Sequence, residues 1–269
     1  MCSGIDPAQN VDNIITSLHE ASKGGAKILF TPEMSNVIDS NGKRALLCLS
    51  EEANDAQLVR IQAAAAETGI WVQLGSMAFL TGKSEGRRVN RALVIDDKGK
   101  IRARYDKMHL FDVDLPTGES WRESASYVSG DHAVVAATPL GLLGLSICYD
   151  LRFPSLYQAH SAAGATVLAI PSAFTASTGK AHWHVLMRGR AIENAAWVIA
   201  AAQSGVHQDG RTTFGHSLVI NPWGEIILDM GEACGIGFAE IDQAITDDVR
   251  ARIPVIAHRR VIPAAEIAS

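Results

Sequence analysis

The chain has 269 residues, of which 47% are hydrophobic and 20% charged, so it can bury a large core and is not intrinsically disordered. Its 24 basic and 29 acidic residues give a net charge of -5, and it contains no Lys/Arg block suited to neutralising phosphates. We therefore expect a single domain over residues 1–269 and no nucleic-acid partner.

The cysteines and the apolar runs indicate the compartment. Cys2, Cys48, Cys148 and Cys234 lie far apart without a CxxC pair, which argues against a disulfide framework or a zinc knuckle. No apolar run reaches the roughly 18 residues of a membrane-spanning helix, and residues 1–6 lack the regions of a signal peptide. We expect a cytoplasmic protein without a membrane partner.

The first half of the chain alternates helical and extended patterns. Asp6 is a suitable N-cap before Pro7, and apolar residues recur at helical spacing until Gly24. The pattern then predicts a strand at 26–30, a helix at 56–67, strands at 70–74 and 77–80, and a hairpin of strands 92–95 and 101–104.

The second half repeats this order after a long irregular stretch at 109–132. The predicted elements are a strand at 142–148, a helix at 155–163, a strand at 166–170, a helix at 181–195, a strand at 197–202, a hairpin at 216–220 and 225–228, a strand at 237–241 and a short final helix. Strands as apolar as 167–170 need cover on both faces. The pattern therefore predicts an α/β fold of two packed sheets with helices outside each.

Cys148 stands where a predicted apolar strand turns into a helix, the layout of a nucleophile elbow. A thiol there lies beside unpaired backbone N–H groups and the positive end of a helix dipole, which favour thiolate and can hold an oxyanion. This arrangement suits acyl transfer. The alternative is a lone buried cysteine that acts as a small hydrophobe.

Glu33 follows the strand at 26–30, at the end of a strand where open α/β sheets place their sites. Walled by apolar neighbours, its carboxyl group would have a raised pKa and could take a proton from a thiol or from water. The alternative is a solvated or helix-capping glutamate.

Lys107 comes shortly after the predicted strand 101–104 and has aromatic and apolar neighbours. A fixed ammonium at this place would stabilise a developing oxyanion, although a lysine after a strand is ordinarily a surface residue. Glu123 lies within the stretch 109–132, and a long loop of this kind is often an active-site element. A surface position is the alternative for Glu123 as well.

Four sequence blocks, taken together, resemble the carbon–nitrogen hydrolases of the nitrilase superfamily. They are FTPE at 30–33, DKMHLFD at 106–112, SICYDLRFP at 146–154, and PSAF at 171–174 with AHW at 181–183. Each block alone is weakly specific, but the blocks occur in the family's order. The likeness extends over essentially the whole chain.

This resemblance implies a four-layer α-β-β-α sandwich, usually dimerised through helices, with a Glu-Lys-Cys triad. Glu33 would be the general base, Lys107 the stabiliser of the tetrahedral intermediate and Cys148 the nucleophile. Glu123 would orient the lysine, and the Tyr149 N–H would complete the oxyanion hole. The partner would be a small-molecule amide, cleaved through a Cys thioester without metal or cofactor.

Within the superfamily the chain is most similar to the branch that contains deaminated glutathione amidase and omega-amidase. The segments SAFTASTG at 172–179, RAIE at 190–193, AAAQ at 200–203 and HRR at 258–260 favour the former. The implied substrate is an anionic 2-oxo acid amide, for which Arg152 is a candidate cation. A structural salt bridge is the alternative for Arg152, and omega-amidase, N-carbamoyl amidohydrolase and nitrilase activities stay open.

Two features depart from the family pattern. The family has a further strand before the position of Met1, so we expect either a truncated start or a missing sheet edge. His184 follows Trp183 where relatives often have glutamate, which leaves fine specificity open.

Other functions have less support from the sequence. His182 and His184 point to different faces of a helix, so we expect no metal site there. The glycine-rich stretch 231–237 lacks a nucleotide-binding motif. The non-enzymatic alternative is a dimeric binding scaffold that has lost activity.

Overall fold

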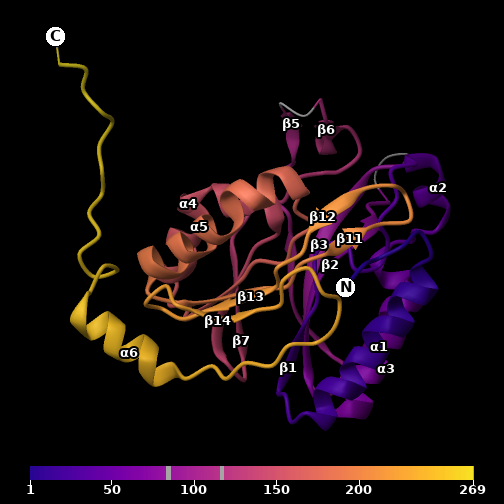
Figure 1. Cartoon of the computed structure of the whole chain (residues 1–269), viewed down its shortest axis with the longest axis horizontal. Helices are drawn as coiled ribbons and strands as arrows, with labels where there is room; N and C mark the ends of the chain where they lie inside the picture. The colour runs from indigo at the N-terminus through magenta and orange to yellow at the C-terminus, as the bar shows by residue number, and fades with distance from the viewer. Residues whose placement is uncertain (83–85, 116–117, 269) are drawn as a thin grey trace.

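Helices and strands alternate through most of the chain, as the computed structural model shows (Figure 1). The structure describes residues 1–82, 86–115 and 118–268. The helices are α1 (Pro7–Lys23), α2 (Gly42–Leu47), α3 (Ala56–Thr68), α4 (Pro154–Ala162), α5 (Ala176–Asn194) and α6 (Gln243–Arg252), with short 3-10 helices η1 (Glu52–Asn54), η2 (Glu123–Ala125) and η3 (Cys148–Arg152). The strands are β1 (Ile28–Phe30), β2 (Trp71–Leu80), β3 (Arg88–Ile95), β4 (Ile101–Asp106), β5 (Asp112–Asp114), β6 (Ser120–Arg122), β7 (Val134–Thr138), β8 (Gly141–Leu145), β9 (Val167–Ala169), β10 (Trp197–Ala200), β11 (Ser204–Val206), β12 (Thr212–Phe214), β13 (Leu218–Ile220) and β14 (Ile226–Asp229).

Capping residues set the bounds of the first long helices. The Asp6 side chain accepts a hydrogen bond from the Ala8 N–H, and Pro7 occupies the first turn of α1, where a missing N–H costs nothing. Helix α3 ends at Gly69, which adopts a left-handed φ of 69°. Both predicted helices are confirmed.

The first sheet has the strand order β1-β2-β3-β4. Strand β1 pairs in parallel with β2, and β2, β3 and β4 pair antiparallel, so the predicted hairpin at 92–104 is confirmed. The two strands predicted at 70–74 and 77–80 form one strand, β2, with a register shift between Leu74 and Met77.

The second sheet has the order β14-β13-β10-β9-β8-β7. Its centre, β8-β9-β10, is parallel, and the flanking pairs are antiparallel. Parallel centres of this kind are buried on both faces, which agrees with the fully buried strand β9.

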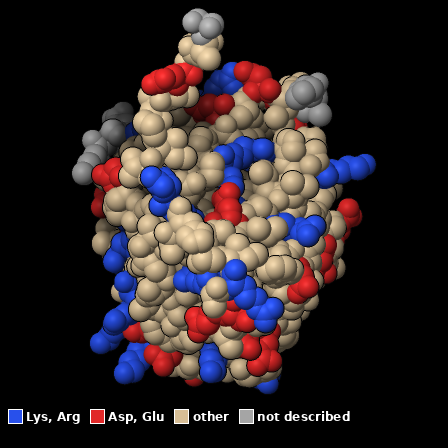
Figure 2. Space-filling model, turned by 90° about the vertical axis from the view of Figure 1, so that its left-hand side faces the viewer, with Lys and Arg blue, Asp and Glu red and all other residues tan. Residues whose placement is uncertain are grey.

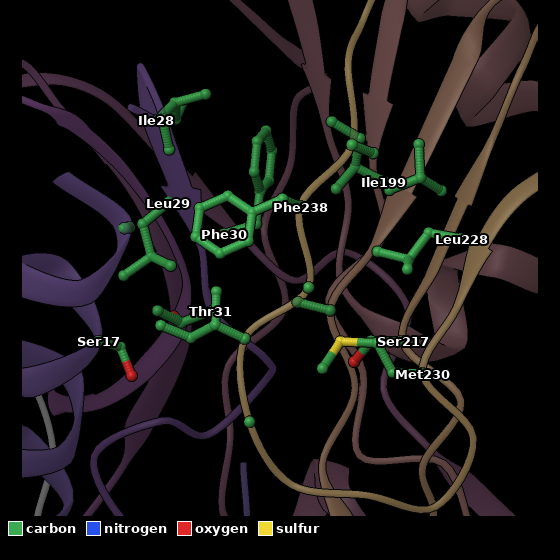
Figure 3. A pocket seen from close by; sticks show the side chains of 18 of the residues that line it. Ser17, Ile28, Leu29, Phe30, Thr31, Ile199, Ser217, Leu228, Met230 and Phe238 are labelled. Carbon is green, nitrogen blue, oxygen red and sulfur yellow. The ribbon is translucent and has the colours of Figure 1, made fainter. Parts of the chain in front are cut away.

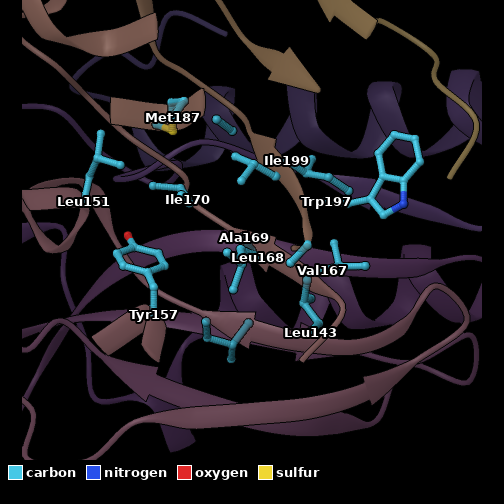
Figure 4. Packing of buried hydrophobic residues seen from close by; sticks show 14 of the residues in the cluster. Leu143, Leu151, Tyr157, Val167, Leu168, Ala169, Ile170, Met187, Trp197 and Ile199 are labelled. Atoms are coloured by element: carbon cyan, nitrogen blue, oxygen red, sulfur yellow. The ribbon is translucent and has the colours of Figure 1, made fainter. Parts of the chain in front are cut away.

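Alternation along β3 shows how the layers stack. Leu93 and Ile95 pack in a core with α1 and α3, whereas Ala92 and Val94 pack against the second sheet. The second sheet shares its own core with α4 and α5, in which Tyr157 and Met187 are buried (Figure 4). The order helix, sheet, sheet, helix confirms the expected α-β-β-α sandwich.

Several predicted elements are wrong. Residues 237–241 form no strand in the described structure, since they pair with no strand of either sheet and an apolar pattern alone supplies no hydrogen-bond ladder. The stretch 109–132 is not wholly irregular: it holds the hairpin β5–β6 and η2, and its residues 116–117 lie outside the described residues. The predicted strand 142–148 ends at Leu145, and the sequence analysis missed β7.

A large cavity of about 990 Å³ runs along the outer edge of β1. Strand β1 is the last strand of its sheet, and the side chains of Phe30 and Phe238 lie close together in the cavity, opposite Ile199 and Leu228 (Figure 3).

The surface carries mixed charge. Figure 2 shows one face on which Lys/Arg and Asp/Glu side chains are interspersed, without a continuous field of one sign. Among the described helices, none has the length and apolar character needed to cross a membrane.

Candidate active site

Four chain segments that are distant in sequence meet at one cavity of about 510 Å³, called here the Cys148 pocket. Glu33 comes just after β1, and Lys107 directly follows β4. Glu123 opens η2, and Cys148 opens η3. All four side chains line this pocket, so the structure brings together the residues that the sequence analysis singled out.

Glu33 and Lys107 form a buried ion pair. The Lys107 Nζ donates to Glu33 Oε1 over 2.9 Å, and the exposed fractions of the two residues are 2% and 4%. The Ala173 N–H donates to the other oxygen, Glu33 Oε2, over 2.8 Å. The alternative of a solvated or surface position is therefore wrong for both Glu33 and Lys107. The Glu33 carboxylate is held in one orientation.

Glu123 is the second carboxylate on the same ammonium. Lys107 Nζ lies 2.9 Å from Glu123 Oε2 and 3.2 Å from Oε1, and the Phe111 N–H donates to Oε2 over 2.7 Å. The Lys107 ammonium is held by two carboxylates, each of which also accepts a backbone N–H, so it cannot leave the pocket without losing several charged contacts.

Cys148 sits in a strained turn. Its φ is 49°, a left-handed value that is rare for a residue with a side chain and typical of a nucleophile elbow. The buried carboxylate of Asp150 holds the turn, because it accepts the Ile147 N–H over 2.9 Å and the Tyr105 hydroxyl over 2.7 Å. The elbow predicted from the sequence is confirmed, although it leads first into η3 and only then into α4.

The protonation state of the pair Glu33 and Cys148 differs from the expectation. Burial and the nearby Glu33 carboxylate raise the pKa of the Cys148 thiol well above its ordinary 9.0. Burial acts to raise the pKa of Glu33, but the Lys107 ammonium and hydrogen bonds from Lys107, Cys148 and Ala173 outweigh it and lower that pKa below 4.5. The resting pair is thus a neutral thiol beside a carboxylate.

Two expectations are corrected by this result. The raised Glu33 pKa was wrong because the pocket supplies a buried cation rather than apolar walls alone. The expectation that Cys148 is a thiolate was wrong. A five-residue 3-10 helix supplies little dipole, while burial and the Glu33 carboxylate disfavour a second anion.

Lys107 remains an ammonium ion. Burial acts to lower its pKa, but the negative charges of Glu123 and Glu33 raise it well above 10.5. A permanent cation therefore lines the pocket that contains Cys148.

The backbone at Tyr149 is free to bind an oxyanion. The Cys148 N–H donates to the Pro171 carbonyl over 2.9 Å, so that donor is occupied. The Tyr149 N–H has no acceptor within the described part of the chain, and Tyr149 lines the Cys148 pocket. This geometry is compatible with the role expected for Tyr149.

Arg152 also lines the Cys148 pocket. Its guanidinium contacts His182 Nδ1 at 3.3 Å and lies over the Phe174 ring at 5.4 Å. No carboxylate of the described residues forms an ion pair with Arg152. The alternative hypothesis of a structural salt bridge is therefore wrong for this arginine.

Asn90 and Asp150 were not predicted from the sequence. The Asn90 side chain donates to Glu33 Oε1 over 2.9 Å and to Glu123 Oε1 at 3.4 Å, and so links the two carboxylates. The available signal for Asn90 was an amide side chain in the predominantly apolar segment 89–95, which also contains Arg91. Asp150 could have been noticed as a carboxylate placed two residues after the nucleophile.

One group of possible metal ligands lies outside this pocket. Ligand atoms of His184, His216 and Asp229 all lie within 4.8 Å of one another. Asp229 accepts from both imidazoles, at 3.0 Å from His184 and 2.9 Å from His216, so the hydrogen bonds within the group account for its geometry. His182 does not take part, as expected for a residue on another face of α5.

Comparison with known proteins shows similarity over nearly the whole chain. The sequence profile of the carbon-nitrogen hydrolase family matches residues 2–251. The deaminated glutathione amidase of Yersinia enterocolitica is 37% identical over 264 residues, which cover 97% of this chain and 91% of that protein.

Solved structures agree in fold. The crystal structure of the Caenorhabditis elegans NitFhit protein superposes with a TM-score of 0.90 at 36% identity, covering 97% of this chain and 63% of that one. An amidase variant from Nesterenkonia sp. AN1, solved with the acetamide moiety of fluoroacetamide attached to its active-site cysteine, superposes with a TM-score of 0.75 at 26% identity. The match covers 87% of this chain and 84% of that one.

Proposed function

The chain belongs to the carbon-nitrogen hydrolase family, and from that premise we propose that Glu33, Lys107 and Cys148 act as a catalytic triad on a linear amide. As a member of the family it is a hydrolase that acts on amide C–N bonds. The observation that carries the assignment is the Lys107 ammonium, held 2.9 Å from Glu33 on the wall of the pocket that contains Cys148.

The first half of the reaction forms a thioester. Glu33 takes the proton of the Cys148 thiol as the sulfur attacks the amide carbonyl carbon. The Lys107 ammonium and the Tyr149 N–H stabilise the negative oxygen of the tetrahedral intermediate. Protonated Glu33 then gives its proton to the leaving nitrogen, the C–N bond breaks, and the acyl group stays on the sulfur.

The second half releases the acid. Glu33 takes a proton from a water molecule, whose oxygen attacks the thioester carbonyl. The C–S bond breaks, and the proton returns from Glu33 to the sulfur. Glu123 and Asn90 act as positioning residues throughout, because they hold Lys107 and Glu33.

The substrate we assign is deaminated glutathione or a closely similar 2-oxo acid amide. The name of the Yersinia relative, similar over 97% of this chain, supports this choice. The pocket volume of about 510 Å³ and its arginine-lined wall suit an anionic molecule of that size.

A substrate panel tests the assignment. We expect the highest kcat/KM for deaminated glutathione, against 2-oxoglutaramate, carbamoyl amino acids and simple nitriles. A preference for 2-oxoglutaramate, a carbamoyl amino acid or a nitrile would replace the substrate assigned here.

Covalent labelling tests the nucleophile. Fluoroacetamide should attach to Cys148, detected by peptide mass spectrometry, and Cys148→Ala should lose turnover by a factor of about 1,000 or more while it keeps its circular dichroism. Cys2, Cys48 and Cys234 are exposed thiols in the same protein and serve as internal references. Absence of Cys148 labelling together with absence of amide turnover in the wild-type protein would favour a scaffold instead. Turnover kept by the alanine variant would show that Cys148 is not the nucleophile.

We further assign a homodimer formed through the outer layer of α5 and the β13–β14 hairpin. Apolar side chains are exposed there on both elements: Val185, Ile192, Trp223, Ile226 and Ile227. Such a patch on an otherwise charged surface is typical of a subunit interface. The four unpaired cysteines support a reducing, cytoplasmic location, and we treat residues 1–269 as one hydrolase domain.

A further inference from the structure

Four arginines line the Cys148 pocket, and three of them have a polar partner among the described residues. These pairs are Arg122 with Asp114, Arg211 with Asp209 and Arg152 with His182. The fourth, Arg88, differs from the others because its guanidinium forms no hydrogen bond or ion pair with any described residue.

Arg88 is also the most buried of the four. Its exposed fraction is 7%, and its Nε is fully buried without an acceptor. The guanidinium lies 4.8 Å from the centre of the Tyr127 ring, a cation–π contact that offsets only part of the lost hydration. A buried guanidinium with unused N–H donors is costly unless an acceptor reaches it.

The backbone fixes Arg88 beside the reacting groups. Its N–H donates to Ser126 O over 3.0 Å, and its carbonyl accepts from the Val128 N–H over 2.8 Å. Residues two apart in a strand face the same side, so Arg88 lies on the same face of β3 as Asn90, about 7 Å along the strand. Asn90 contacts Glu33 and Glu123, and Arg88 therefore sits one step along β3 from those carboxylates.

We propose that Arg88 binds a carboxylate carried by the acyl part of the amide substrate. Its planar fork of N–H donors matches the two oxygens of a carboxylate and would be satisfied only when substrate is bound. This assignment rests on the proposed function and names the substrate class: amides of dicarboxylic or 2-oxo dicarboxylic acids.

The difference in burial between Arg88 and Arg152 indicates which part of the substrate contacts Arg88. The acyl group stays on Cys148 after the first step, whereas the amine must leave through the open side of the pocket. Arg88 is buried and Arg152 is half-buried, so the carboxylate on the retained acyl group is the one that reaches Arg88.

The test compares two amides of similar length, glutaramate, which has a terminal carboxylate, and pentanamide, which has none. Arg88→Met should lower kcat/KM for glutaramate by about 100-fold, the range of a lost charged hydrogen bond, and change kcat/KM for pentanamide by less than about threefold. Arg88→Lys should fall between, because an ammonium keeps the charge but not the fork.

Arg102→Met is the matched control, since it removes the same charge from an exposed arginine of β4. It should change neither substrate by more than about twofold, as expected for a screened surface charge. A binding measurement adds a readout that does not need turnover: by calorimetry, Cys148→Ala with Arg88→Met should bind glutaramate at least tenfold more weakly than Cys148→Ala alone.

The outcomes separate the two proposals. Equal losses for glutaramate and pentanamide, or unchanged calorimetric binding, would overturn the role of Arg88 and indicate that it only balances the charge of Glu33 and Glu123. If Arg88→Met does not fold, Arg88→Lys and its smaller selective loss decide the matter. Failure of the wild-type protein to hydrolyse any amide and to label at Cys148 would instead overturn the proposed function.

Discussion

At the scale of single residues, the position of one proton dominates the chemistry. Cys148 keeps its proton at rest because its own burial and the Glu33 carboxylate disfavour a thiolate, and Glu33 stays ionised because Lys107 and three hydrogen-bond donors favour its charged form. In the proposed mechanism the thiol therefore loses its proton to Glu33 only as the sulfur attacks the substrate. A buried and protonated thiol is less susceptible to oxidation than an exposed thiolate.

The pH profile follows from these two pKa shifts. The active form has Glu33 ionised and Cys148 protonated; Glu33 loses its charge only below its ordinary 4.5, and Cys148 loses its proton only above its ordinary 9.0. With a neutral amide as substrate, kcat/KM should be flat between these two values, wherever the protein stays folded. An apparent pKa near neutrality in that profile would show a resting thiolate and contradict the assignment.

Removal of the Lys107 ammonium tests the third residue of the proposed triad. Lys107→Met should lower kcat by about 100- to 1,000-fold, since one oxyanion-stabilising group is lost. It should also raise the pKa of Glu33, because the main charge that lowers it is gone, and so move the acid limb of the profile to higher pH.

Lys98→Met removes an exposed lysine from the 96–99 turn and is the control for charge alone. Steady-state kinetics of both variants decide the point. A Lys107→Met enzyme with a kcat within tenfold of wild type would remove this lysine from the mechanism.

At the scale of elements, the ends of strands position the site. Strand β1 leads to Glu33, β4 leads to Lys107, and β8 leads through a short turn to Cys148. The irregularity in β2 lies at the same place, because its register shifts between Leu74 and Met77 next to the segment that carries Glu33. The sheet thus bends where the chain leaves it to form the pocket.

Gly75 in this bend has no room for a side chain. A Cβ there would lie 1.9 Å from the Thr31 carbonyl oxygen and 2.6 Å from Pro171 Cβ. Gly75→Ala should displace the segment that carries Glu33, lower kcat by about 100-fold as expected for a misplacement of about 1 Å, and reduce the free energy of unfolding by about 1–3 kcal/mol.

The control is Glu67→Ala in α3, an exposed helical position on the layer opposite the proposed dimer face. It should leave kcat unchanged and leave stability equal or slightly higher, since alanine is the better helix former. Denaturant titration and steady-state kinetics measure both effects. Wild-type kcat in Gly75→Ala would show that the backbone near Glu33 tolerates movement.

At the scale of the whole molecule, two outer helical layers cover two sheets, and the layers differ in what they expose. Helix α5 exposes Val185, which is 72% exposed, and Ile192, close to the exposed side chains of the β13–β14 hairpin. The group of His184, His216 and Asp229 joins the same two elements. We expect this layer to be covered by a second copy.

Val185→Asp should therefore convert the dimer to a monomer, because burial of an unpaired carboxylate at an interface is unfavourable. Val59→Asp on α3 is the matched control, since Val59 is 60% exposed on the opposite outer layer. Sedimentation velocity should show the dimer mass for wild type and Val59→Asp only. A monomeric wild type, or a dimeric Val185→Asp, would place the interface elsewhere or remove it.

The residue pattern alone predicted the type of fold and the candidate site residues. Helix caps such as Asp6 and Gly69 and the apolar run 167–170 act locally, so their effects can be read from neighbouring residues. The resemblance to a known family then pointed to Glu33, Lys107 and Cys148. Three-residue strands such as β5 were missed because so short a segment has no measurable period.

The charge states and the missing partner of Arg88 depend on the three-dimensional arrangement of the chain. The pKa of Glu33 depends on Lys107, and whether Arg88 has a partner depends on Tyr127 and the surrounding pocket; these groups are far apart along the chain. Electrostatic and desolvation energies depend on distance and burial in space, and a linear sequence contains neither.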